Sequence, residues 1–113
     1  MKNMFFTYLV VKKEEWESER GNSKIGHFEM DKYGFIHSST VIGLAAIIDR
    51  FLIDLDNELV LTINTYEDEV TYEDKDVDHL YPHFYHLIDL DQIVDVTPLA
   101  EFMERGDLDA RTT

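Results

Sequence analysis

The side chains of this chain best suited to chemistry are its histidines, and four of the five lie in two short segments. His37 belongs to the segment 34–40, while the segment 79–86 carries His79, His83 and His86. An imidazole titrates near pH 6.5, so it can donate a proton, accept one or bind a metal near neutral pH. We expect His37 and His83 to share one site, because polar groups set among aromatic residues need common access to water.

The histidines of segment 79–86 have helical spacings, but these do not predict a metal site. On a helix, His79, His83 and His86 would lie on one face, as metal ligands do. Pro82 disfavours a helix here, and in an extended segment His83 and His86 point to opposite faces. A site without cysteine would also need a carboxylate such as Asp78 or Glu73. We expect no bound metal.

The first segment leads into a predicted helix and offers a site for an anion. Alternation places Phe35 and His37 on one face of a short strand, and Ser38, Ser39 and Thr40 precede a helix expected over 41–52. The first N–H groups of a helix attract phosphates and carboxylates, and His37 would stand beside them. The alternative is that Ser39 only caps the helix and His37 is a hydrogen-bonded structural residue.

Length and composition predict one globular domain. The chain has 113 residues, of which 44% are hydrophobic, and no cysteine. We therefore expect a single domain over 1–113, with a frayed tail at 107–113, and neither disulfides nor a cysteine nucleophile. No stretch is apolar enough to span a bilayer or to act as a cleaved leader, so we expect no membrane association and a cytoplasmic location.

The chain is strongly acidic, with a formal net charge of −14. Residues 1–40 carry six basic and six acidic side chains, whereas residues 41–113 carry four and eighteen. Such a surface repels the phosphate backbone, so extended nucleic acid is not an expected partner. A small anion could still bind locally in the neutral first third. The simplest interpretation of the acidity is a charged, solvent-exposed surface that keeps the protein soluble.

The order of predicted elements indicates an α+β fold. Helices and strands mix without regular alternation, which favours small mixed or antiparallel sheets with a few helices, and no dinucleotide fingerprint or P-loop is present. We expect strands at 4–11, 59–64, 70–72 and 92–96, helices at 13–20, 41–52 and 98–105, a weak strand near 27–30, and an exposed loop at 73–78.

Two motifs carry a resemblance that covers nearly the whole chain. The residues that resemble, in order and spacing, the bacterial family known as domain of unknown function 952 are Tyr8, Trp16, the run 34–37, the pair 39–40 and the run 82–85. The resemblance implies a fold like that of the ADP-ribosyltransferases and tRNA 2′-phosphotransferases, which hold NAD or an ADP-ribose group in a cleft between two small sheets. It does not supply an activity.

We expect a small nucleotide-like or phosphate-bearing ligand, with an NAD-like nucleotide as the cofactor type. If the chain is an enzyme, transfer or hydrolysis at an ADP-ribosyl or phosphate-ester bond is the most economical reaction. The alternative is a non-catalytic module whose aromatic segments bind a ligand or a protein, and a homo-oligomer stays open. The candidate catalytic residues are His37, His83 and Glu73, and the candidate ligand-binding residues are Tyr8, Ser38, Ser39, Thr40 and Tyr85.

The chain also departs from the pattern of the family it resembles. Leu9 stands where members usually have a histidine on the first strand, which weakens the transferase interpretation. Ser38 replaces a frequent cysteine, and His86 and Leu87 replace a usual Gly-Pro. Glu73 would take the transferases' carboxylate role of steadying a ribose hydroxyl.

Overall fold

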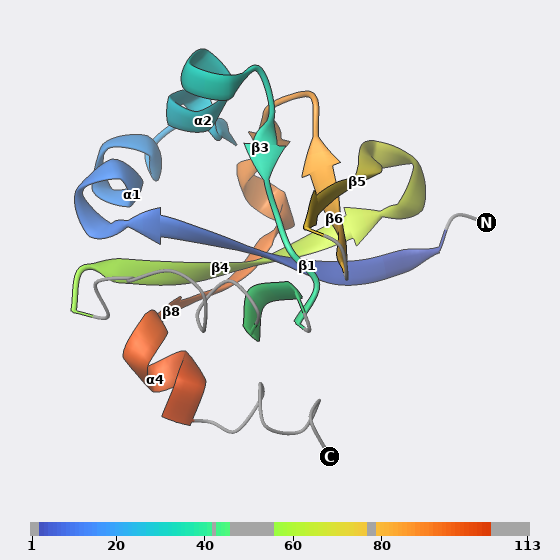
Figure 1. Ribbon diagram of the computed structural model, residues 1–113. Coiled ribbons are helices and arrows are strands. Elements are labelled where there is room, and N and C mark those ends of the chain that lie inside the picture. Colours follow the sequence, from blue (N-terminus) through green and yellow to red (C-terminus); the bar gives the residue numbers. More distant parts are fainter. Residues whose placement is uncertain (1–2, 42, 46–55, 77–78, 105–113) are drawn as a thin grey trace.

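The computed structural model describes residues 3–41, 43–45, 56–76 and 79–104. They form one α+β domain of short helices and largely antiparallel sheets, as expected (Figure 1). Among the described residues, no helix combines the length and apolar character needed to cross a bilayer. The predicted tail at 107–113 and most of the predicted helix at 41–52 lie outside the described residues, although Val41 and residues 43–45 are helical.

The largest sheet has three antiparallel strands in the order β1-β4-β8. They are β1 (Met4–Lys12), β4 (Glu58–Tyr66) and β8 (Ile93–Pro98). Leu9 pairs with Leu61 across the first two strands, so the apolar residues at alternate positions share one face. The predicted strands in these regions are confirmed, with β4 extending further at both ends.

A second three-stranded sheet, β3-β6-β5, carries both histidine segments. Its strands are β3 (Ile36–His37), β6 (His79–Phe84) and β5 (Val70–Asp76). A two-stranded sheet pairs β2 (Lys24–Ile25) with β7 (Ile88–Asp89). After β3 the chain runs beside β1, where Tyr8 and Ser39 exchange two backbone hydrogen bonds of 2.8 Å, and this bridge connects the two larger sheets.

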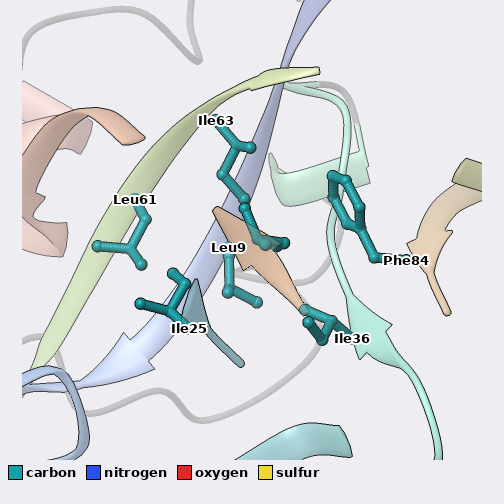
Figure 2. Packing of buried hydrophobic residues seen from close by; sticks show 7 residues of the cluster. Leu9, Ile25, Ile36, Leu61, Ile63 and Phe84 are labelled. Carbon is teal, nitrogen blue, oxygen red and sulfur yellow. The ribbon is translucent and has the colours of Figure 1, made fainter. Parts of the chain in front are cut away.

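The main core lies between these three sheets. Leu9, Leu61 and Ile63 come from the large sheet, Ile36 and Phe84 from the second sheet, and Ile25 and Ile88 from the third (Figure 2). All seven side chains are buried, which gives the short strands the apolar contacts that two-residue pairings lack by themselves.

A smaller core lies on the opposite face of the large sheet. It contains Val60 and residues of the helical stretch after Thr40, together with Leu99 and Phe102 of α4 (Leu99–Glu104). Figure 1 shows α4 on one side of this sheet, with α1 (Lys13–Glu19) and α2 (His27–Tyr33) on the other. The two faces of one sheet therefore bury two separate clusters.

Two secondary-structure predictions are wrong. Residues 27–30 form the start of helix α2, whose first N–H groups, those of Gly26 and His27, donate to the carboxylate of Glu19 at 3.0 and 2.8 Å. Residues 73–76, expected as a loop, continue strand β5. This strand lies at the edge of its sheet, where charged side chains can face water and also discourage pairing with another chain.

Candidate functional site

Strands β3 and β6 bring the two candidate histidines together. His37 and His83 are direct partners in the antiparallel register, and their ring centroids are 5.2 Å apart at an interplanar angle of 66°. The expectation that His37 and His83 come together in space is therefore confirmed. The two rings lie on the face opposite Ile36 and Phe84, because side chains alternate along both strands.

A carboxylate fixes the ring of His83. Glu73, on β5, accepts a hydrogen bond from His83 Nδ1 at 2.9 Å and from the Tyr85 hydroxyl at 2.5 Å, both at Oε1. These two bonds, that of Tyr85 first, lower the pKa of Glu73, so this carboxylate is ionised at neutral pH and acts only as an acceptor. The hydrogen bond that the Tyr85 hydroxyl donates to Glu73 also raises the pKa of Tyr85, because it stabilises the neutral phenol.

A second carboxylate, that of Glu29 on α2, holds the other histidine. Its Oε1 accepts the backbone N–H of His37 at 2.7 Å, and its Oε2 lies 3.4 Å from His37 Nδ1. The longer distance is that of an ion-pair contact rather than a hydrogen bond. Each imidazole thus has a carboxylate on its Nδ1 side, an arrangement that orients a histidine and directs its Nε2 away from the carboxylate.

An aromatic layer covers the histidine pair unevenly. Phe35 stacks on His83 with centroids 4.7 Å apart at 30°, and Tyr33 meets the edge of His37 at 4.7 Å. His83 is therefore only 2% exposed, whereas the side chain of His37 keeps 21% of its accessible surface. Tyr85, 5.4 Å from Phe35, is 51% exposed. The groups of this site that reach solvent are His37, the carboxylates of Glu29 and Glu73, and the two tyrosines.

Residues 38–40, which follow β3, make hydrogen bonds within the protein. Ser38 is buried and donates a hydrogen bond to the carbonyl of Pro82, and the backbone of Ser39 is paired with Tyr8. The hydroxyl of Thr40 accepts the N–H of Gly43 at 3.1 Å, so Thr40, rather than Ser39, caps the following helix. The hydroxyls of Ser38 and Thr40 and the backbone of Ser39, in the run expected to contact an anion, are therefore engaged within the protein, and the cap expected at Ser39 is made by Thr40.

Tyr8 is also separated from the histidine pair by its side-chain direction. Its ring packs edge-on against Phe102 of α4 at 5.6 Å, as part of the smaller core. The neighbouring Leu9 points to the opposite face of β1 and is 2% exposed in the main core. Leu9 therefore packs on the core face of β3 and β6, with Ile36 and Phe84, and not on the face that carries the two imidazoles.

The family of the chain follows from a match that spans most of its length. The model of the family described as protein of unknown function, DUF952, matches residues 10–96. The chain belongs to this family. The sequence resemblance is thereby confirmed at the level of the family, and no curated protein matches the chain.

Solved structures similar to this DUF952 chain share its fold. The crystal structure of CC0527 from Caulobacter crescentus has a TM-score of 0.69 at 14% identity, covering 82% of this chain and 84% of the other. The solution NMR structure of CC0527 has a TM-score of 0.69 at 16% identity, with coverage of 82% and 83%. At this level of identity the likeness concerns the fold alone, which is small and α+β.

The described residues around the histidine pair do not form a metal-binding cluster. Within the described ranges, no three histidine or carboxylate side chains are placed to hold one metal ion. A groove of about 640 Å³ lies elsewhere, between α1 and the large sheet, where Trp16 and Val96 are among its lining residues. The two histidines lie beside the rings of Tyr33 and Phe35 on one face of the sheet β3-β6-β5.

Three residues of this DUF952 site were missed by sequence reasoning, namely Glu29, Tyr33 and Phe35. Glu29 and Tyr33 are four positions apart, a spacing that places them on one face once 27–33 is taken as a helix. The flanking Gly26 and Gly34, with φ of +103° and +83°, were the available signal for that helix. Phe35 lay on the predicted face of His37, but without an assigned role.

Proposed function

We propose that this DUF952 chain is a cytoplasmic protein whose histidine pair binds a small nucleotide-like ligand and moves a proton during transfer or hydrolysis at an ADP-ribosyl or phosphate-ester bond. The observation that carries the proposal is the pair of adjacent imidazoles, 5.2 Å apart, each with a carboxylate at its Nδ1. The choice of NAD and ADP-ribose as ligand types rests on the resemblance to ADP-ribosyltransferases.

His37 is the proton donor or acceptor in this proposal. It is the more exposed histidine, and Glu29 occupies the Nδ1 side of its ring. The Nε2 side then serves the ligand, as in other carboxylate-oriented histidines. His83 was expected to be catalytic as well; because it is buried and stacked on Phe35, the proposal gives it the role of positioning Glu73.

Glu73 and the tyrosines recognise the ligand. The ionised carboxylate of Glu73 keeps 39% of its side-chain surface and can accept hydrogen bonds from the hydroxyls of a ribose. Tyr33 and Tyr85 are 48% and 51% exposed beside Phe35, and exposed rings are surfaces on which a nucleobase stacks. The ribose and the base of a nucleotide would therefore each meet a suitable group.

Protein interaction is the second candidate function. On the same sheet Tyr72 is 45% and Leu80 is 55% exposed, and exposed apolar side chains on neighbouring strands are common at binding surfaces. A partner protein covering this sheet would need no proton transfer. The two candidates differ in whether His37 matters for binding a nucleotide.

Thermal unfolding with added ADP-ribose, NAD or inorganic phosphate separates these functions. A ligand that binds only the native state raises the Tm, so ADP-ribose or NAD should raise it for the natural chain. His37→Ala should abolish that rise, whereas His86→Ala, which removes an exposed histidine outside the pair, should retain it. Release of nicotinamide from NAD, followed by NMR, then tests the reaction. An equal Tm rise in His37→Ala would contradict the proposal.

A further inference from the structure

The groove between α1 and the large sheet has a mostly apolar lining, although the molecule as a whole is acidic. It has a volume of about 640 Å³, within the size range of small-molecule sites. Its apolar lining includes residues from four places in the chain, with Trp16 on α1, Leu59 on β4, Leu90 directly after β7 and Val96 on β8. Val96 is 39% exposed, so the apolar surface is accessible to a ligand.

One face of helix α1 borders this groove. Lys13, Trp16, Glu17 and Arg20 line it, at spacings of three and four that define one helical face. Both cations of the segment 13–20 therefore border the groove, in a chain whose net charge is −14. Arg20 is paired with Glu17 at 3.3 Å.

Lys13 is the cation available to a ligand. It is exposed, and within the described ranges its ammonium group has no hydrogen bond or ion pair. An ammonium group beside an apolar groove is complementary to a molecule with a hydrocarbon body and one anionic end. Because Glu17 neutralises Arg20, Lys13 is the lining residue that attracts an anion to the groove, while most of the acidic surface of the molecule repels one.

We propose that this groove is a second binding site, separate from the histidine pair, for a small amphipathic carboxylate. The carboxylate meets Lys13, and the hydrocarbon body lies on Trp16, Leu59 and Val96. The proposal does not depend on the function of the histidines.

Fluorescence tests this site directly, because Trp16 is the single tryptophan of the chain. Octanoate added to the full chain below its micelle-forming concentration should change the Trp16 emission saturably, and 1-octanol should bind more weakly. Lys13→Gln should weaken octanoate binding about three- to fivefold, as expected for one exposed ion pair. The matched control, Lys32→Gln, makes the same charge change on α2 and should bind as the natural chain does.

Three results would overturn the proposal. If octanoate leaves the Trp16 emission unchanged, the groove is not a binding site for it. If 1-octanol binds as tightly as octanoate, the charge of Lys13 has no role in binding. Emission that depends on protein concentration without added octanoate would show that a second copy of the chain covers the groove. Circular dichroism of both variants checks that each is folded before the comparison.

Discussion

At the scale of single residues, Glu73 connects His83 and Tyr85 within the histidine site. Its Oε1 accepts hydrogen bonds from His83 Nδ1 and from the Tyr85 hydroxyl, and these bonds lower the pKa of Glu73. A depressed folded-state pKa stabilises the fold above the unfolded value, near 4.5. That contribution is lost as the pH falls through the folded-state pKa, so the site should loosen in acid.

Tyr85→Phe should raise the pKa of Glu73 toward its ordinary value of 4.5, because the largest cause of the depression is removed. The side-chain carboxyl resonance of Glu73, followed by NMR against pH, gives both values. Tyr66→Phe removes a hydroxyl from a tyrosine outside the cluster and should leave that pKa unchanged. A Glu73 pKa that is the same in the natural chain and in Tyr85→Phe would refute the assigned hydrogen bond.

His83 and His37 should differ in what they contribute to stability. His83→Ala removes a buried ring that stacks on Phe35 and a hydrogen bond to Glu73, so it should lower the free energy of unfolding by about 2 to 4 kcal/mol. His37→Ala removes a ring that is partly exposed and should cost about 1 kcal/mol or less. Urea melts of the two variants measure this difference, and the reverse order would contradict the assigned roles.

At the scale of elements, sequence patterns predicted the strands and helices with strong apolar signals. The strand β1, the helix α1 and the opposed directions of Ile36 and His37 all follow from local spacing. Helix α2 did not follow, since its seven residues begin against the carboxylate of Glu19, a contact made by tertiary structure.

The candidate site was predictable only in part for the same reason. The meeting of His37 and His83 was expected from their aromatic surroundings, and register confirms it. Glu29 could not be assigned while α2 was taken for a strand. The burial of His83 depends on Phe35 stacking over it, and a single sequence does not reveal which face of a two-residue strand is covered.

Gly26 offers a test of how the elements position the site. Its φ is +103°, and a Cβ at this position would lie 2.2 Å from Cδ1 of Ile36, the residue before His37. Gly26→Ala should lower the free energy of unfolding by about 2 to 4 kcal/mol, through backbone strain and overpacking. Gly21→Ala is the matched control, because a Cβ there meets nothing within 4 Å, and it should be nearly neutral. Equal urea midpoints for the two variants would show that Gly26 is not constrained in this way.

At the scale of the whole molecule, charge is distributed as unevenly as the sequence indicates. The net charge of −14 arises after residue 40, whereas α1 and α2 come from the neutral first third. The two proposed sites use this neutral third, because His37 with Glu29 and the groove beside Lys13 both draw on it. An anionic ligand would meet less repulsion there than on the acidic remainder.

The acidic remainder should make stability depend on salt. Mutual repulsion of carboxylates disfavours the compact state, and added ions screen it. The Tm at neutral pH should therefore rise between low salt and about 0.5 M NaCl, where the screening length is a few ångströms. Differential scanning calorimetry measures this, with KCl as a control that should behave alike. A Tm that falls with salt would mean that attractive ion pairs outweigh the repulsion.

The most direct test of the central claim observes the imidazoles themselves. Long-range nitrogen NMR of the full chain, titrated with ADP-ribose, reports on each histidine ring. The ring signals of His37 should move saturably, with smaller changes at His83, while His27 and His86, both exposed and outside the pair, should stay in place. Unchanged signals at His37 with millimolar ADP-ribose, or equal movement at His86, would contradict the claim that the histidine pair is a nucleotide site.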